Sequence, residues 1–372
     1  MEHAFRAAAG RTPFSIGIEE ELMIVDGTSF DLVNGVEALL GESPVGEVKP
    51  ELMESVLEIA TDPVANTVEA GEQLRALRTL VAGRAADQGW SIGSAGTHPF
   101  ALWEHQRIAK RDRYRDLVRE LRFIARQELL FGLHVHVGLD DPDQAIHVAD
   151  GMRVHLPILM ALSGNSPFWR GDRTGLMSTR TAIFRAFPRV GVPTAYGSWE
   201  RYDREIEFMM RSGVMSDPTY VWHDVRPHPK FGTVEIRVCD GQTRVEHTLA
   251  LAALIQAMVH ELAAHYDAGE QLGDYPWQIL DENKYLAAIH GLDGELVDLP
   301  TSDRVSTRVL ARRLLDRLRP HAEQLGSADA LDGIADLIER GTGGDRQVLV
   351  YDTNHDLHEV TGEIVAKTLG RD

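Results

Sequence analysis

The sequence predicts an α+β fold built on a largely antiparallel sheet. Strand-like runs and helical patterns follow one another irregularly along the 372 residues, without the regular βαβ succession of a parallel sheet. Hydrophobic residues make up 43% of the chain, so a sizeable core is available. Neither an internal repeat nor a Pro/Gly/Ser-rich linker divides the sequence. We therefore expect residues 1–372 to form a single domain.

Apolar and β-branched residues gather in five runs that are typical of strands. These runs cover residues 14–25, 47–60, 90–96, 132–139 and 232–239. Helical spacing of apolar residues fills much of the chain between them and after them. The expected helices cover residues 66–89, 107–130, 148–162, 243–266 and 303–325.

Boundary residues support several of these helices. Gly89 is expected to end the first one, because glycine readily adopts the conformation found after a helix. Pro157 should kink the third helix. Thr243, with Glu246 three residues later, predicts a capping box at the start of the fourth.

The charge balance limits the class of partner. Asp and Glu number 57 and Lys and Arg 38, which gives a net charge of −19. Such acidity argues against a nucleic acid or an anionic membrane as the main partner. It leaves room for a local basic pocket that binds a small anion such as ATP. We therefore expect small-molecule substrates.

Cysteine content and apolar patterning predict a cytoplasmic protein. Cys239 is the only cysteine, so no disulfide can form within the chain, as expected in a reducing compartment. The first residues, MEHAFRAAAGRTPF, lack an apolar core of signal-peptide length. The most apolar stretch is interrupted by Gln256, His260 and Glu261, so it predicts a buried helix rather than a membrane span.

The first unusual motif is GIEEELMIV, residues 17–25, which places three glutamates in an apolar strand. Side chains alternate along a strand, so Glu19 and Glu21 share one face and Glu20 takes the other. One interpretation is an edge strand with a charged, solvated face. The other is a pair of carboxylates that binds a metal ion.

The second motif is PELMESVLEIATDP, residues 50–63, which contains Glu51 and Glu58. A helix would place both on one face together with Glu54. Pro50 and Pro63 bracket the segment, and two short strands joined by a tight turn could also bring Glu51 and Glu58 together. The residues alone leave both options open.

The third and fourth motifs also carry polar groups on strands. In LFGLHVHVGL, His134 and His136 share one face of the strand. They could bind a metal ion or a substrate, or they could be core histidines held by hydrogen bonds. In GTVEIRVCDGQT, Glu235 and Arg237 share a face, either as an internal ion pair or as a metal ligand beside a phosphate-binding arginine. Cys239 follows on the same strand, and we expect it near the site.

Taken together, the motifs favour a magnesium or manganese site over a zinc site. Carboxylate oxygens suit Mg²⁺ or Mn²⁺, whereas zinc prefers cysteine and histidine. Several carboxylates around more than one divalent ion form an arrangement that can hold the phosphates of ATP during phosphoryl transfer.

In this order, GIEEEL, ELMESVLEIAT, GLHVHVG and VEIRVCDGQT resemble the motifs of the type 2 glutamate–cysteine ligase family, carboxylate–amine ligases of the glutamine synthetase-like superfamily. The resemblance runs from about Phe14 to Gln347. It implies a curved, largely antiparallel sheet whose concave face forms the active site, with helices packed outside. It also favours the two short strands for residues 51–58.

The resemblance implies a role for each matching residue. Arg237 would contact ATP phosphate beside the catalytic Glu235. His136, which stands where glutamine synthetases have asparagine, is assigned to substrate or nucleotide. Arg226 would bind the nucleotide, and Arg180 and Arg346 would bind substrate. The implied metal ligands are Glu19, Glu21, Glu51, Glu58, His134 and Glu235.

The resemblance further implies an ATP-dependent ligase that joins the γ-carboxylate of glutamate to an amino group. Cysteine would supply that amine, and a γ-glutamyl phosphate would be the intermediate. A homo-oligomer is compatible with this prediction. Three alternatives remain open at this stage: a metal-dependent hydrolase that uses the His-x-His strand, a non-catalytic nucleotide-binding regulator, and a ligase with another acceptor amine.

Overall fold

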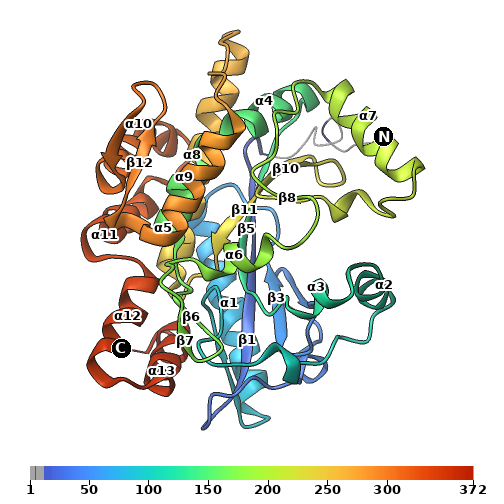
Figure 1. The fold of residues 1–372 in the computed structure, drawn as a ribbon, viewed down its shortest axis with the longest axis vertical. Helices are drawn as coiled ribbons and strands as arrows, with labels where there is room; N and C mark the ends of the chain where they lie inside the picture. Colours follow the sequence, from blue (N-terminus) through green and yellow to red (C-terminus); the bar gives the residue numbers. More distant parts are fainter. Residues whose placement is uncertain (1–4, 6–11, 372) are drawn as a thin grey trace.

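A computed structural model describes Phe5 and residues 12–371 (Figure 1). Its centre is a seven-stranded antiparallel sheet in the order β10–β11–β5–β1–β3–β2, with β4 paired to the far end of β1. The α+β prediction is confirmed. The strands of this sheet are β1 (Ile16–Asp26), β2 (Glu47–Pro50), β3 (Val56–Ala60), β4 (Trp90–Gly93), β5 (Gly132–Gly138), β10 (Val225–His228) and β11 (Thr233–Asp240).

Helices pack around this sheet, and the C-terminal ones gather on one side of it (Figure 1). Their bounds are α1 (Thr67–Ala86), α2 (Asp112–Leu121), α3 (Phe123–Arg126), α4 (Pro142–Met152), α5 (Leu156–Ser163), α6 (Thr179–Phe184), α7 (Trp199–Arg211), α8 (Val245–Asp267), α9 (Trp277–His290), α10 (Thr307–Gln324), α11 (Asp332–Arg340), α12 (Gly343–Asn354) and α13 (Leu357–Thr368). Three short strand pairs lie outside the main sheet: β6 (Phe168–Trp169) with β7 (Asp172–Arg173), β8 (Val190–Gly191) with β9 (Trp222–His223), and β12 (Glu295–Asp298) with β13 (Asp303–Ser306).

Alternation along β1 separates the core from the site. Ile18, Leu22 and Ile24 are fully buried in the main hydrophobic cluster, which also includes α1 and α8 residues. Glu20 points to the same side and is fully buried, where Arg78 of α1 binds both of its oxygens at 2.7 and 2.8 Å. A buried carboxylate that is paired in this way supports the fold, and it leaves the opposite face free for chemistry.

The apolar helix α8 is a core helix, as predicted. It is long and apolar enough to cross a membrane, but 83% of its most apolar window is buried inside the protein. The predicted capping box is wrong. Thr243 donates instead to the carbonyl of Ser94, at 2.8 Å, and the N-cap residue Arg244 makes no capping bond with its side chain. A tertiary contact has thus replaced the local one.

Two other predicted helices are divided, and a third starts later than predicted. Residues 107–130 form α2 and α3, separated at Arg122, whose φ of +53° cannot continue a helix. Residues 148–162 belong to α4 and α5, which meet at a bend of 62°. Pro157 lies in the first turn of α5, so it starts a new helix rather than kinking a continuous one. Residues 303–325 begin with β13 before α10.

The segment at residues 47–60 forms the two short strands β2 and β3, and the helical option is wrong. β3 pairs with β1 so that Glu58 lies opposite Glu21, while β2 flanks β3 on its other edge. Glu54, which a helix would have placed beside Glu51, instead binds Arg107 at 2.7 Å.

Candidate active site

A pocket of about 310 Å³ opens on the sheet face that carries Glu19 and Glu21. β1, β3, β5, β10 and β11 each contribute side chains to it, and segments near α2 and α6 close its sides. Apart from Arg346, it brings together the residues to which the family resemblance assigned a role: Glu19, Glu21, Glu51, Glu58, His134, His136, Arg180, Arg226, Glu235 and Arg237.

An acidic triad occupies one part of this pocket. Glu21, Glu51 and Glu58 each offer an oxygen within 4.8 Å of the others. Burial and the neighbouring Glu21 raise the pKa of Glu51 to about 7. Burial, with Glu19 and Glu51 nearby, raises the pKa of Glu58 well above its usual range. Three carboxylates this close repel one another unless a cation or a proton lies between them.

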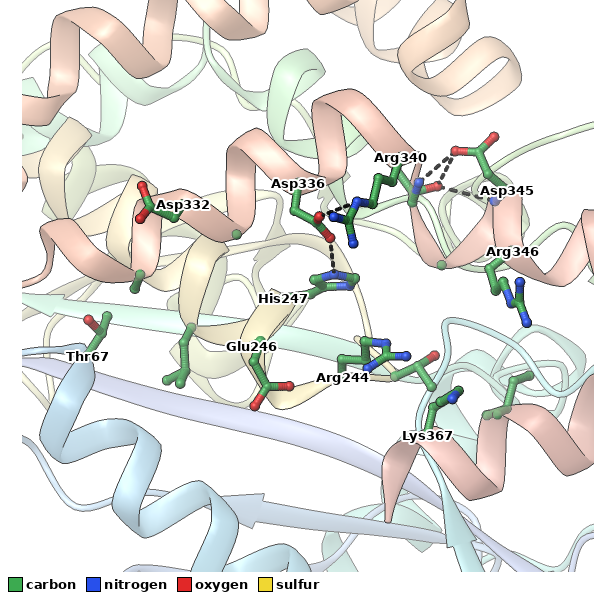
Figure 2. A pocket seen from close by; sticks show the side chains of 18 of the residues that line it. Thr67, Arg244, Glu246, His247, Asp332, Asp336, Arg340, Asp345, Arg346 and Lys367 are labelled. Carbon is green, nitrogen blue, oxygen red and sulfur yellow. Dashed lines mark hydrogen bonds and ion pairs between the residues drawn. The ribbon is translucent and has the colours of Figure 1, made fainter. Parts of the chain in front are cut away.

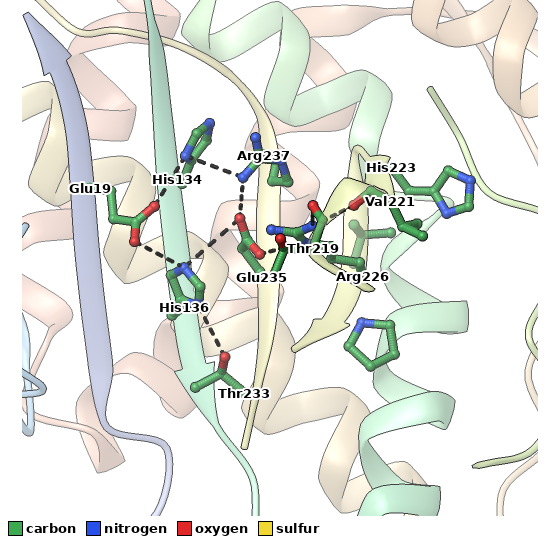
Figure 3. A network of polar contacts seen from close by, with 12 residues as sticks. Glu19, His134, His136, Thr219, Val221, His223, Arg226, Thr233, Glu235 and Arg237 are labelled. Carbon is green, nitrogen blue, oxygen red and sulfur yellow. Dashed lines mark hydrogen bonds and ion pairs between the residues drawn. The ribbon is translucent and has the colours of Figure 1, made fainter. Parts of the chain in front are cut away.

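A mixed triad lies beside it. Glu19, His134 and Glu235 likewise place one ligand atom each within 4.8 Å of one another. Antiparallel register sets Glu19 opposite His134, and Nδ1 of His134 lies 3.3 Å from Glu19 Oε2 (Figure 3). Nε2 of His134 is buried and lacks a hydrogen-bond partner among the described residues. Burial alone would raise the pKa of Glu19, but hydrogen bonds from His134 and His136 outweigh it and hold that pKa well below normal.

Two arginines surround the carboxylate of Glu235. Arg226 donates to Oε2 at 2.6 Å, and Arg237 donates to Oε1 (Figure 3). Their charges outweigh burial and keep the pKa of Glu235 well below its usual range. Arg226 also donates to the carbonyls of Thr219 and Val221. Nε of Arg237 is buried without a partner among the described residues, so it could donate to an anion in the pocket.

The donor sets fit divalent cations. Each triad supplies three ligand atoms, five of the six being carboxylate oxygens. Such oxygen-rich sets suit Mg²⁺ or Mn²⁺. A bound cation would relieve the repulsion among the carboxylates of the acidic triad. The two triads could therefore hold two ions side by side.

Arg180 and Arg346 lie in different places. Arg180 is 6% exposed and lines the candidate pocket. Arg346 lies on α12 at a separate cavity of about 1260 Å³ (Figure 2). There it binds Glu363 at 2.6 Å. Arg346 does not line the pocket of the two triads, because α12 packs on the side of the molecule where α1, α8, α11 and α13 meet. Its role in substrate binding stays a prediction. That cavity contains none of the residues of the two triads.

Comparison with known proteins decides the family. The model of glutamate–cysteine ligase family 2 matches residues 15–367 of this chain. The chain belongs to glutamate–cysteine ligase family 2. It is 41% identical over 363 residues to a Rubrobacter xylanophilus protein provisionally named glutamate–cysteine ligase 2-1, covering 96% of each chain. It is 38% identical over 360 residues to a Sorangium cellulosum protein provisionally named glutamate–cysteine ligase 2, covering 95% of this chain and 96% of that one.

Solved structures share the fold at low sequence identity. A glutamate–cysteine ligase from Francisella tularensis, in complex with AMP, superposes with a TM-score of 0.72 at 14% identity. The match covers 97% of this chain and 90% of that one. A bifunctional glutathione synthetase from Pasteurella multocida gives a TM-score of 0.71 at 15% identity, covering 97% of this chain and 53% of that one. These structures show the shared fold. The family match and the named relatives identify this member of glutamate–cysteine ligase family 2 as an enzyme of the class that forms C–N bonds.

Sequence reasoning missed several side chains of this family member's pocket. Glu128 lines it from the segment after α3, and burial raises its pKa well above the usual range. Tyr114 of α2 reaches the carbonyl of Pro50 at 2.7 Å. Aromatic side chains complete the wall: Phe184, Phe187, Tyr220 and Trp222. None of them belongs to a strand motif, so no local pattern in the sequence indicated their convergence.

Cys239 does not line the pocket, so its expected place near the site is wrong. The pairing of β11 with β5 shifts register between Ile236 and Cys239, which marks a β-bulge. Beyond the bulge Cys239 is fully buried in the main hydrophobic cluster, and burial raises the pKa of its thiol to about 12. A thiol of this kind is a poor nucleophile at neutral pH.

Proposed function

We propose that this enzyme is an ATP-dependent carboxylate–amine ligase. It would join the γ-carboxylate of glutamate to an amino group, with cysteine as the expected acceptor, through a γ-glutamyl phosphate. The observation that supports this most directly is the pair of triads, Glu21–Glu51–Glu58 and Glu19–His134–Glu235, in one pocket. The provisional names of its relatives and the AMP complex of the Francisella tularensis ligase support it independently.

Activation of the carboxylate by ATP is needed because a carboxylate does not react with an amine at neutral pH. In the proposed reaction a γ-carboxylate oxygen of glutamate attacks the γ-phosphorus of ATP, and ADP leaves. The amine then attacks the acyl carbon, and phosphate leaves with that oxygen. Divalent cations in the two triads would neutralise the phosphate charge during the first transfer.

The chain's own residues would align the reactants and balance their charge. Arg237, whose Nε lacks a partner among the described residues, would donate to a phosphate oxygen. His136, with Nδ1 3.0 Å from the hydroxyl of Thr233, would be held in place to contact the nucleotide. Arg180 would bind the carboxylate of an amino-acid substrate. Alignment of this kind can supply much of the rate enhancement.

Labelled substrate tests the intermediate. Glutamate carrying heavy oxygen on its γ-carboxylate should yield one labelled inorganic phosphate for each amide bond formed, together with ADP. Release of pyrophosphate together with labelled AMP would instead indicate that the intermediate is a γ-glutamyl adenylate. ADP with unlabelled phosphate would mean that water hydrolyses ATP without coupling, and it would refute the ligase proposal. No ATP consumption under any condition would favour a nucleotide-binding regulator.

A panel of acceptor amines identifies the second substrate. The enzyme, ATP, Mg²⁺ and glutamate are incubated with cysteine, other amino acids and small amines, and products are read by mass spectrometry. Cysteine should give the highest kcat/KM. A faster reaction with another amine would keep the ligase chemistry and change only the acceptor.

The compartment is part of the same proposal. The only cysteine is fully buried with its thiol protonated, and the net charge is −19. Both observations support an enzyme that works in the cytoplasm on small molecules rather than on nucleic acid or a membrane surface.

A further inference from the structure

A buried carboxylate outside both triads lies at the end of β11. Asp240 is fully buried and accepts three hydrogen bonds, from the backbone N–H of Asn165 at 2.9 Å and from the hydroxyls of Ser166 at 2.6 Å and Ser178 at 2.9 Å. Among the described residues no lysine or arginine forms an ion pair with it. Burial of this carboxylate costs stability, and the charge of Arg180, together with the three hydrogen bonds, offsets part of that cost.

The two serines connect Asp240 to the start of α6. Ser178 is the residue directly before this helix, and the hydroxyl of Ser166 accepts the backbone N–H of Arg180 at 3.2 Å. α6 has only six residues, Thr179–Phe184, and a helix of this length has little stability of its own. Its position therefore depends on tertiary contacts. Ser166 and Ser178 make some of these contacts, beside the bond from the N–H of Ser178 to the carbonyl of Ala288 at 3.0 Å, and Asp240 binds both serines.

The side chain of Arg180 returns to the same strand. Its guanidinium donates to the carbonyls of Arg237 at 3.3 Å and Val238 at 3.4 Å, which lie in the β-bulge of β11. Gly132 on β5 makes room for it, because a Cβ there would come within 2.5 Å of Nη2 of Arg180. Both the backbone and the guanidinium of Arg180 are thus fixed relative to the strand that carries Arg237.

Asp240 itself is closely fitted. A Cβ at Gly96 would lie 2.5 Å from the carboxyl carbon of Asp240, so the glycine is required for this packing. The carboxylate has little room to move, and its hydrogen bonds therefore define where α6 begins. Asp240 thus lies behind Arg180, where it can orient Arg180 without contacting the substrate itself.

We propose that Asp240, acting through Ser166 and Ser178, is a positioning residue that holds Arg180 in the substrate pocket. This inference rests on the proposed function, because it takes Arg180 to bind a substrate carboxylate. It assigns to the aspartate that ends the VEIRVCD motif a task distinct from metal binding.

The first test compares Michaelis constants. Asp240→Asn keeps the shape of the side chain but replaces one acceptor oxygen by an N–H₂ group, which cannot accept a serine hydroxyl. We expect the KM of one amino-acid substrate to rise about tenfold or more, with the KM of ATP within about twofold of wild type. Ser178→Ala should raise the same KM by a smaller factor. Equal rises for all substrates, or no change, would overturn the proposal.

A double variant tests whether Asp240 acts through Arg180. If it does, the KM effects of Asp240→Asn and Arg180→Lys should not multiply in the combined variant. Multiplication of the two factors would show independent roles and would overturn the proposal. If Asp240→Asn fails to fold, Ser166→Ala and Ser178→Ala take its place in both measurements.

A chemical measurement separates this inference from the ligase proposal. Phenylglyoxal modifies accessible arginines, and peptide mass spectrometry gives the rate at each site. In Asp240→Asn we expect Arg180 to react several-fold faster than in wild type, while Arg226, buried in the same pocket, reacts at the wild-type rate. Unchanged reactivity of Arg180 would refute positioning by Asp240. This result stands even if the wild-type enzyme forms no amide, the outcome that would refute the ligase proposal alone.

Discussion

The acidic triad should make the metal-free protein less stable as the pH rises, and Glu51→Gln should remove most of that loss. Below pH 4.5 the Glu51 carboxyl is protonated in both the folded and the unfolded state. Its pKa in the folded protein is about 7, so at pH values above 4.5 the unfolded chain ionises more readily than the folded protein. A difference of about 2.5 pKa units corresponds to about 3 kcal/mol of stability, lost as the pH rises through 7.

Direct repulsion gives the same magnitude. The ligand atoms of Glu21, Glu51 and Glu58 lie within 4.8 Å of one another. Two unit charges at that separation repel by about 3 kcal/mol at an effective dielectric constant of 20. Glutamine at position 51 keeps the shape and removes the charge. The variant should therefore be more stable than wild type at pH 8.5, by about 3 kcal/mol at most, and similar to it near pH 5.

Urea unfolding followed by circular dichroism measures this difference, at pH 5 and at pH 8.5 in the presence of EDTA. Added Mg²⁺ should stabilise wild type more than Glu51→Gln, and the variant should lose most ligase activity. Glu54→Gln is the matched control, because Glu54 binds Arg107 at 2.7 Å and its loss should lower stability. A Glu51→Gln protein no more stable than wild type at pH 8.5 would refute the repulsion argument.

Three further predictions follow from buried groups. Cys239→Ser should keep ligase activity within about tenfold, a change of about 1.4 kcal/mol in barrier, and complete loss in a folded variant would instead indicate a covalent thioester. Glu235→Gln should abolish activity and also lower the urea midpoint of unfolding. Arg226 and Arg237 would lose their carboxylate partner, at a cost of about 3 kcal/mol. A midpoint equal to that of wild type would contradict the ion-pair assignment. Burial lowers the pKa of His98 to about 4, so this histidine should cost about 3 kcal/mol of stability as the pH falls from 6.5 to 4. In thermal melts a His98→Gln protein should lose less stability than wild type over that range. Equal losses in the two proteins would rule His98 out as a cause.

Most of what the sequence could predict about the site follows from the alternation of side chains along a strand. Glu19 and Glu21 face the pocket, and Glu20 faces the core, as the period of two requires. His134 and His136 line the pocket together for the same reason. These predictions succeeded because a strand's side-chain direction is a local property. The order of the four motifs indicates the family from the sequence alone.

The remaining features depend on contacts that are distant in sequence. Nothing local to Thr243 shows that Ser94 will accept its hydroxyl. The β-bulge that removes Cys239 from the pocket exists only in the pairing of β11 with β5. Arg346 follows a glycine-rich stretch near the end of the chain, and only the packing of α12 decides which cavity it meets. Glu128 likewise reaches the pocket through the course of the chain after α3.

The placement of β1 has a consequence for how this gene can change over evolution. β1 pairs with β3 along one edge and with β5 and β4 along the other, and its two faces serve different purposes. Deleting or inserting one residue within Ile16–Asp26 would exchange those faces downstream of the change. The Glu20 carboxylate and a candidate metal ligand would then be misplaced together. Insertions and deletions should therefore be rare in this strand among related genes, whereas the loop between β1 and β2 should vary freely in length.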